Sequence, residues 1–400
     1  MTQVMKLLAT GKTAEAIATL RDAVDAEPLD AERRKALANA LATAGLNETA
    51  AGEARRAAEL FPDQADLRTQ AARFWMAAGK IEASPEALLR LLAPWRKQGA
   101  VQVAFEASGC FLWVFDLLGQ ELGREQVHVA QAAKIAAIAN SQEKNDENDA
   151  WWLAYLLWDR RLPEAFVAEG SLRELRIAGR ELRSYTDLRS DLVRRVRSHL
   201  AQLGVRLSKG WHTSKVKREA ARAAILGVAG MRGEALPELY EQVVSVTAVI
   251  ARWRKEVERL CGEFPEVQTI AVEMPGFAMQ MAGLVYGELG SPGRYHKEKA
   301  YAKATGLTPG SRKTGGKEQQ RCISRAGSRH ARWAFTRAVI ACLRCKHGPG
   351  AQVRAWVEKQ CRRQKCKRKV IVAAARKLAE GVWRLLAWGE AFDLRKAFPT

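Results

Sequence analysis

The sequence lacks the features of a membrane-spanning or secreted protein. None of its 400 residues belongs to a run of about eighteen apolar residues, the length that a transmembrane helix needs. The opening residues, MTQVMKLLATGKTAEA, contain no apolar segment followed by a small-residue cleavage site. Seven cysteines, an odd number scattered along the chain, argue against a disulfide framework. We therefore expect a cytoplasmic protein.

Acidic residues are scarce only in the last part of the chain, which carries the net charge of +21. Residues 1–80 contain 11 basic and 11 acidic side chains, and residues 81–292 contain 27 of each. Residues 293–400 contain 27 basic and 6 acidic side chains. A basic segment joined to a neutral remainder favours a polyanionic partner. Nucleic acid is favoured over a membrane because no amphipathic anchoring pattern accompanies the charge.

The first 80 residues repeat. A spacing of 34 residues relates Gly11, Gly45 and Gly79, and also Pro28 and Pro62. Paired Ala-rich helices with this period resemble tetratricopeptide repeats, and about two repeats need neighbouring structure to cap them. Two interpretations stay open: a groove that binds a protein partner, or a helical segment with no partner.

Residues 81–164 alternate between helical and strand patterns. SPEALLRLLAPWR predicts a helix that begins at Ser84, AVQVAFEASG a strand that ends at Glu106, CFLWVFDLLGQEL a helix, and QVHVA a second strand. This alternation indicates part of a mostly parallel sheet. An acid at the carboxyl end of such a strand stands where open α/β sheets place their sites.

Asp146 and Asp149 open the apolar run KNDENDAWWLAYLLWD. Asn and Asp at a helix start can cap its free N–H groups. Two acids three residues apart also share one helix face, where they could hold a metal ion. The residues alone leave both interpretations open.

Residues 165–262 are long, charged and helical. They predict an antiparallel helical pair, a coiled-coil arm interrupted near SKGWHTS, with an ordinary helical bundle as the alternative. The apolar residues near heptad spacing are Leu172, Leu175, Leu182, Leu192, Val196, Leu200 and Leu203.

Residues 263–400 form the basic C-terminal segment. VEMPGFAMQMAG resembles a helix-hairpin-helix, in which backbone N–H groups near Gly276 would hold a phosphate. TGLTPGSRKTGGKEQQ predicts a flexible Gly-rich loop, and RCISRAGSRHARWAFTRAVIACLRC predicts a helix whose arginines and Trp333 suit a nucleic-acid backbone with stacking.

These pieces, in order, resemble a known family. FEASG, KNDENDAWWLA, MPGFAMQMAG, GLTPGSRKTGG, ISRAGSRHARWAF and AARKLAEGVWRLL resemble the IS110 insertion-sequence transposases over residues 81–400. The resemblance implies a RuvC-like (RNase H-like) half with four metal-binding carboxylates and a C-terminal half with a nucleophilic serine. It also implies recombination through a phosphoserine link to DNA, guided by a structured bridge RNA, in a homo-oligomer (dimer or tetramer) at the bacterial nucleoid.

Carried over to this chain, the resemblance assigns Glu106, Asp146 and Asp149 as catalytic ligands of Mg²⁺ and places Thr314 at the nucleophile. Clustered carboxylates are hard oxygen ligands, as Mg²⁺ beside a phosphate requires. The residues expected to bind nucleic acid are Lys313, Lys317, Arg325, Arg329, Arg332, Arg337 and Gly276.

Two departures from the family pattern matter. The family's first Asp lies on an early strand, but the repeat helices occupy that region here, and neither Asp63 nor Asp66 sits in a strand pattern. We therefore expect a truncated sheet, weakened ion binding, and strand exchange that is slow or undetectable while DNA binding survives. The nucleophile position holds Thr314, a more crowded hydroxyl than serine, and Ser311 in the same loop is the alternative.

Four cysteines, Cys342, Cys345, Cys361 and Cys366, follow C-x2-C-x15-C-x4-C, close to the spacing of a zinc site, with His347 nearby. Buried small residues in a helix are the alternative. Because the resemblance implies no zinc, we expect none.

The expected fold is mainly α with an α/β part. It comprises tetratricopeptide-like hairpins (1–80), a truncated RuvC-like sheet (81–164), a coiled-coil arm (165–262) and an α-helical DNA-binding domain (263–400). The expected function is that of a DNA transposase. The competing class is a non-enzymatic nucleic-acid-binding protein whose repeats contact another protein.

Overall fold

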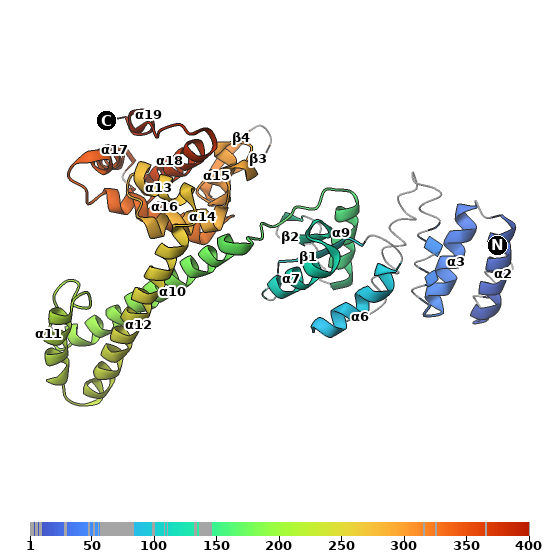
Figure 1. Cartoon of the computed structure of the whole chain (residues 1–400), viewed down its shortest axis with the longest axis horizontal. Helices are drawn as coiled ribbons and strands as arrows, with labels where there is room; N and C mark the ends of the chain where they lie inside the picture. The colour runs from blue at the N-terminus through green and yellow to red at the C-terminus, as the bar shows by residue number, and fades with distance from the viewer. Residues whose placement is uncertain are drawn as a thin grey trace. The chain divides into compact units, whose positions relative to one another are not determined.

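The computed structural model describes residues 4–399 except for several short gaps and two longer ones. The parts outside the description are residues 5–6, 8–9, 28–29, 47–48, 51–52, 55, 57–83, 98–100, 108, 110, 132–133, 136–145, 315–316, 325 and 365. The chain divides into two compact units, Met1–Val167 and Ala168–Thr400 (Figure 1). It is mainly helical with a small α/β part, as predicted. No described helix is long and apolar enough to cross a membrane.

The first unit begins with a helical hairpin of α2 (Thr13–Ala26) and α3 (Ala31–Thr43). The two helices pack through the apolar side chains of Leu20 and Leu41, both fully buried, and Asp30 caps α3 by accepting a hydrogen bond from Arg33 N. Residues 57–80 of the predicted repeat array lie outside the described residues. A helical hairpin is therefore present, and its identity as a tetratricopeptide repeat stays a prediction.

A βαβ unit follows, as the sequence predicted. Its elements are α6 (Pro85–Arg96), β1 (Val103–Glu106), α7 (Phe111–Leu122), the short 3₁₀ helix η1 (Arg124–Gln126), β2 (Val127–Ala130) and α9 (Asp146–Trp158). β1 and β2 are parallel, with Ala104 opposite His128 and Glu106 opposite Ala130. Ser84 caps α6 by accepting from Ala87 N.

The two faces of this small sheet are covered by different helices. Phe105 and Val129 pack in one apolar cluster with Leu118 of α7. The alternate residues Ala104 and Ala130 pack in another cluster with α9. Successive side chains of a strand point to opposite faces, so the two clusters lie on opposite sides of the sheet.

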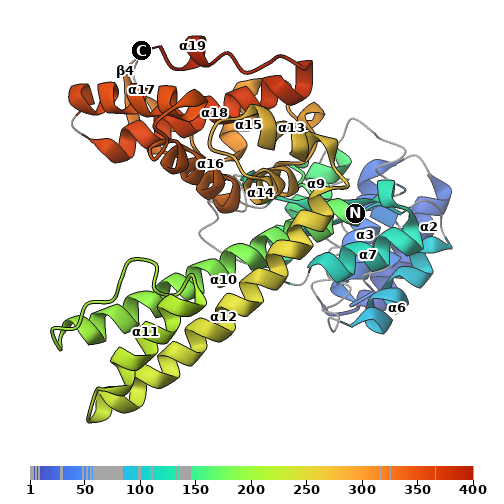
Figure 2. The same cartoon turned by 60° about the vertical axis from the view of Figure 1, so that its left-hand side comes forward.

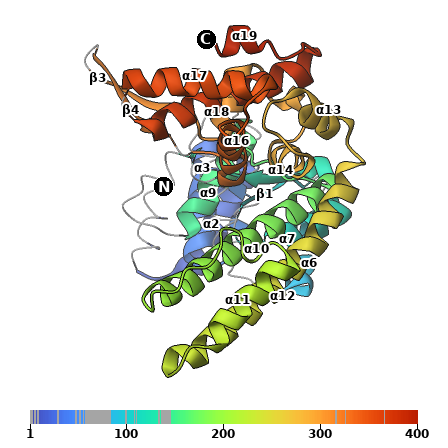
Figure 3. The same cartoon turned by 90° about the vertical axis from the view of Figure 1, so that its left-hand side faces the viewer.

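The second unit contains the predicted antiparallel arm. α10 (Gly170–Ala201) and α12 (Met231–Cys261) run side by side, with α11 (Lys215–Leu226) packed at their far end (Figures 2 and 3). The start of α12 meets the end of α10, where Arg232 donates to Gln202 Oε1 at 2.7 Å. Apolar residues near heptad spacing on α10, such as Val196 and Leu200, are buried against α11 and α12.

The base of the arm belongs to the C-terminal core. Leu175 of α10 and Val257 of α12 share one apolar cluster with Phe335 and Leu378. The elements that surround this core are α13 (Pro265–Glu273), α14 (Met279–Leu289), η3 (Pro292–Arg294), α15 (Glu298–Ala304), α16 (Arg329–Cys342), α17 (Gly348–Gln364), α18 (Lys367–Trp388) and α19 (Leu394–Ala397). The arm and the basic segment therefore form one compact unit, and the predicted four-part division of the chain stays a prediction.

One segment differs from the expectation of a flexible loop. Residues 309–314 and 317–323 form two paired antiparallel strands, β3 (Pro309–Thr314) and β4 (Lys317–Ile323). Its strands are polar, so the hydrophobic pattern carried no strand signal, and backbone pairing holds them together. The sequence Gly315-Gly316 is favoured between the strands of a hairpin, but the same pattern also predicts a flexible loop.

Candidate functional site

Glu106 stands at the carboxyl end of β1, with an exposed side chain. It lies two residues after Ala104 and opposite Ala130, both of which pack toward α9. Strand alternation therefore directs Glu106 to the α9 face of the sheet.

Asp149 reaches the same face from α9. It lies one helical turn before Leu153, which is buried against Ala130 of the sheet. Its Oδ1 is buried and has no hydrogen-bond partner in the described part of the chain. A buried carboxylate oxygen without a donor is unfavourable unless a cation or a proton compensates it. Glu106 and Asp149 therefore lie on one side of the sheet.

The third predicted ligand, Asp146, is the first residue of α9, but its side chain lies outside the described residues. Within the described part of the chain, no three His, Cys, Asp or Glu side chains come together as a metal site. The convergence of all three acids therefore stays a prediction. Asp63 and Asp66, weighed as replacements for the family's first Asp, also lie outside the description.

Sequence reasoning missed a polar pair on this face. His128 of β2 and Glu164 are joined by a hydrogen bond of 2.8 Å between Nδ1 and Oε1. Glu164 comes from an extended segment that adds an antiparallel bridge beside Ala130. His128 Nε2 is buried without a partner in the described structure. Alternation within QVHVA could have placed His128 on the same face as Glu106. No sequence pattern predicted that the segment around Glu164 would pair beside β2.

The predicted nucleophile lies on the β3–β4 hairpin. Thr314 ends β3 opposite Lys317, and Ser311 pairs with Gln320. The structure describes the backbone of these strands, and the side chains of Thr314, Ser311, Lys313 and Lys317 lie outside the description. Arg325 lies outside the description altogether, and α16, which carries the other predicted arginines, begins at Arg329.

Gly276 occupies the predicted hairpin between α13 and α14. Its φ of +79° is one that glycine adopts without strain, and a Cβ added there would lie 2.2 Å from the carbonyl oxygen of Ala338. The neighbouring Met274 and Phe277 are buried in the domain core. The glycine therefore lets the hairpin pack closely on α16, and its contact with a phosphate stays a prediction.

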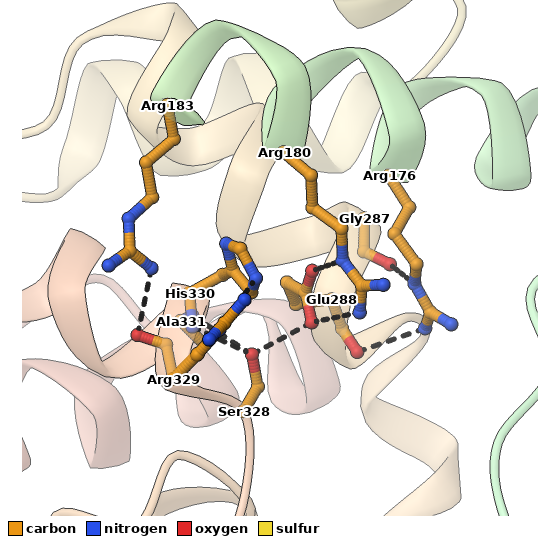
Figure 4. Close-up of polar contacts among 9 residues, drawn as sticks. All are labelled: Arg176, Arg180, Arg183, Gly287, Glu288, Ser328, Arg329, His330 and Ala331. Atoms are coloured by element: carbon orange, nitrogen blue, oxygen red, sulfur yellow. Dashed lines mark hydrogen bonds and ion pairs between the residues drawn. The ribbon is translucent and has the colours of Figure 1, made fainter. Parts of the chain in front are cut away.

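A buried carboxylate joins the arm to the domain (Figure 4). Glu288 of α14 has a side chain only 3% exposed and accepts two hydrogen bonds from Arg180 of α10, at 2.5 and 3.1 Å. Ser328 Oγ donates a third bond of 2.7 Å. Burial alone would raise the pKa of Glu288, but the hydrogen bond and charge of Arg180 hold that pKa below its usual value.

The same hydrogen-bond network also caps the N-terminus of α16. Ser328 caps this helix by accepting from the N–H groups of His330 and Ala331 (Figure 4). Arg176 donates to the carbonyl oxygens of Gly287 and Glu288, and burial lowers its pKa to about 10. Burial also lowers the pKa of His330 to about 4, so this imidazole is neutral at pH 7.

The predicted basic set on α16 divides into internal and exposed members. Arg332 donates to Thr305 O at 3.3 Å and so holds α16 to α15. Trp333 packs partly against the core, and the guanidinium groups of Arg183 and Arg337 lie 4.9 and 5.6 Å from its ring centre. Arg329 and Arg337 are exposed.

The cysteine pattern does not produce a cluster. Cys342 is buried at the end of α16, where burial raises the pKa of its thiol to about 12. Cys345 donates to Ala341 O, and its sulfur packs against Gly350. All four cysteines and His347 are described residues, and they do not form one of the groups that could hold a metal.

A βαβ sheet with acids on one face, together with a basic helical domain, is suited to nucleic-acid chemistry. Comparison with protein families identifies the class as transposases. The model of the Transposase IS116/IS110/IS902 family matches residues 268–354, and that of the DEDD transposases of IS110 matches residues 70–205. The chain belongs to the IS110 family of transposases. No curated protein matches the chain.

Proposed function

We propose that this transposase cleaves and rejoins DNA strands through a hydroxyl nucleophile on the β3–β4 hairpin, assisted by carboxylates of the βαβ unit. The observation that carries the proposal is the placement of Glu106 and Asp149 on one face of the sheet, in a chain that matches both halves of the family. The buried, unpartnered Oδ1 of Asp149 fits a role that requires a cation.

The covalent step is an exchange of phosphodiester bonds. The hydroxyl oxygen of Thr314 forms a bond to phosphorus, the bond from phosphorus to a sugar oxygen breaks, and the hydroxyl proton passes to that leaving oxygen. The phosphoester preserves the bond energy, so attack by the hydroxyl of a second strand restores DNA without an energy source. Ser311 is the alternative nucleophile on the same strand.

The acidic residues would act on the phosphate. Glu106, Asp149 and Asp146 are oxygen donors that would hold Mg²⁺, which when bound stabilises negative charge on the phosphate oxygens. Lys313 and Lys317, on either side of the hairpin connection, would offset the charge of the same group. Because the family's first Asp has no counterpart in a strand pattern, we expect ion binding to be weak and strand exchange to be slow.

The family resemblance supports DNA as partner, a structured guide RNA, a homo-oligomer, and action at the nucleoid in the cytoplasm. The α2–α3 hairpin supports a protein partner for the N-terminal residues. A non-enzymatic nucleic-acid-binding protein is the competing function, and it is less favoured because both halves of a transposase match.

The test is to trap covalent protein–DNA adducts formed by the wild type, Thr314→Ala and Ser311→Ala, with recombination between donor and target plasmids measured in parallel. We expect an adduct that Thr314→Ala abolishes and Ser311→Ala preserves. The reverse pattern moves the nucleophile to Ser311. Glu106→Gln and Asp149→Asn should abolish adducts while leaving DNA binding intact. Adducts that survive all four changes would overturn the proposal.

A further inference from the structure

The far end of the arm is strongly basic. We call residues 192–226, which include the end of α10, the turn after it and α11, the basic arm end. It contains nine basic residues and one acidic residue, Glu219. By contrast, α12 beside it contains five of each sign. This local excess disappears in the balanced charge of residues 81–292 because acids elsewhere in that segment offset it.

The cations of the basic arm end are available to a ligand. Arg195, Arg206, Lys209, Lys215 and Lys217 are exposed. None of them forms an ion pair with a described acid, whereas Arg194 pairs with Asp191. Surface cations without acidic partners keep their full attraction for phosphate groups.

The scaffold beneath these cations is well packed. Trp211 of the turn is fully buried and stacks on Tyr240 of α12, with ring centres 6.0 Å apart and planes at 17°. Tyr240 in turn donates its hydroxyl hydrogen to Arg218 O of α11. These contacts belong to a separate apolar cluster at the end of the arm. The cations are therefore carried on a structured surface.

Several cations converge at the turn. Arg197 donates to Ser208 O at 3.4 Å, and Arg218 donates to His212 O at 3.2 Å. The pKa of His212 is lowered by burial and then by the charges of Arg189, Arg197 and Arg218. Guanidinium groups from α10 and α11 thus crowd one imidazole, and no carboxylate contributes to this shift.

The start of α11 concentrates charge against the preference of a helix. Ser214 caps it, its first turn contains Lys215 and Lys217, and no acid stands there. Cations at a helix N-terminus oppose the helix dipole and reduce helix stability. The two lysines therefore do not stabilise the helix itself, and their position favours the binding of an external anion.

We propose that the basic arm end binds the phosphate backbone of a nucleic-acid duplex, separately from the DNA contacts of the C-terminal helical domain. Figure 1 shows α11 at the opposite end of the arm from α14 and α16. A duplex is favoured over a single strand because the one Trp, Tyr or Phe of the basic arm end, Trp211, is buried, which leaves no exposed ring for stacking bases. The inference does not depend on the hydroxyl chemistry proposed above.

The test compares two charge reversals of equal size in the full chain. One is Lys215→Glu with Lys217→Glu; the control is Arg252→Glu with Lys255→Glu, two exposed positions of α12 on the same arm. The probes are a labelled DNA duplex, a labelled RNA stem-loop and a labelled single strand of arbitrary sequence. Affinity is measured by anisotropy over a range of salt concentrations.

We expect the Lys215 and Lys217 reversal to weaken duplex binding about tenfold and to reduce the salt slope by about two, one for each phosphate that the variant no longer neutralises. The control variant should change the duplex affinity and the salt slope much less. Acids are favourable at a helix start, so the melting temperature of the double variant should stay equal or rise, which separates a binding defect from a folding defect.

The outcomes show whether the bound duplex is DNA or RNA. A loss confined to DNA assigns the surface to the DNA substrate, and a loss confined to RNA assigns it to a structured RNA; either supports the proposal. Equal losses in the two double variants, no loss on any probe, or a larger loss on the single strand would overturn it. None of these results depends on whether a covalent adduct forms.

Discussion

Guanidinium groups in the helical domain and at the basic arm end have different neighbours. In the domain, Arg332 binds the carbonyl oxygen of Thr305 and Arg384 pairs with Glu298, and at the base of the arm Arg180 binds the buried carboxylate of Glu288. At the basic arm end, Arg195 and Arg206 contact no described acid. The first set holds helices together, and the second is available to a ligand.

This difference shows that formal charge and available charge are separate quantities. Residues 293–400 carry the whole net excess of positive charge, yet some of these cations, such as Arg332 and Arg384, bind groups of the protein itself. The basic arm end lies in a segment with no net charge, yet most of its exposed cations pair with no described acid. Predictions of a nucleic-acid surface therefore need the contacts of each cation as well as the count.

The largest expected effect comes from removing the scaffold of the basic arm end. Trp211→Ala deletes a fully buried ring that stacks on Tyr240, which should destabilise the arm end by about 3–5 kcal/mol. Hydrogen exchange in α11 should accelerate, and duplex affinity should fall with it. Trp211→Phe is the control and should cost less, since it keeps most of the ring area. Full protection of α11 in Trp211→Ala would contradict this account.

The next effect tests whether Gly276 serves packing or phosphate. Gly276→Ala places a Cβ 2.2 Å from a backbone oxygen at a positive φ, so we expect a loss of about 3 kcal/mol in the free energy of unfolding. Gly348→Ala is the matched control, because Gly348 has a similar φ of +72° but an added Cβ there would meet no heavy atom within 4 Å. If Gly276→Ala instead weakens DNA binding at unchanged stability, the phosphate role predicted from the sequence is the correct one.

A third prediction separates the two uses of arginine. Glu288→Gln removes a buried charge that binds Arg180 and Ser328, which should cost about 2 kcal/mol of stability. Arg180 is 46% exposed on its side chain and would become available, so duplex affinity should stay equal or rise. Glu298→Gln, which weakens a longer hydrogen bond of 3.4 Å from Arg384 and a backbone hydrogen bond at the start of α15, should cost less. Chemical denaturation and anisotropy measure the two effects, and a fall in affinity would contradict the assignment.

Much of the fold was predictable where the chain follows a regular period. The alternation in AVQVAFEASG and QVHVA placed both strands, and the near-heptad spacing of Val196 and Leu200 placed the arm. The β3–β4 hairpin was missed because its strands are polar and its order comes from backbone pairing. The basic arm end was also missed, because the net charge was counted over all of residues 81–292, where acidic residues elsewhere offset it.

The candidate site was predictable only in part. The family resemblance singled out Glu106 and Asp149, and their place on one face follows from strand alternation for Glu106 and from the packing of Leu153 in α9 for Asp149. Glu164 was not predictable, because its position depends on an irregular segment that returns beside β2. Likewise, no local pattern pairs Glu288 with Arg180, which lies 108 residues away in the sequence.

The smallest expected effect concerns pH. The pKa of His330 falls to about 4 in the folded domain, chiefly through burial and then through Arg183, Arg180 and Arg329, although Glu288 opposes the shift. The unfolded chain takes up this proton near pH 6.5, so acid favours unfolding. Stability from His330 is therefore complete above about pH 6.5 and is lost as pH falls toward 4. The lowered pKa of Glu288 acts in the same direction, but only below its ordinary value of 4.5.

Between pH 6.5 and 4.5, His330 should thus be the main contributor of the two. We expect wild type to lose about 1 kcal/mol relative to His330→Gln over this range, a value reduced because the imidazole is only half-buried and solvent screens its neighbours. Denaturant midpoints of both proteins at several pH values give the difference. His347→Gln, at an exposed position, is the control and should follow the wild-type curve. Parallel curves for wild type and His330→Gln would show that burial and the neighbouring arginines do not lower the pKa of His330.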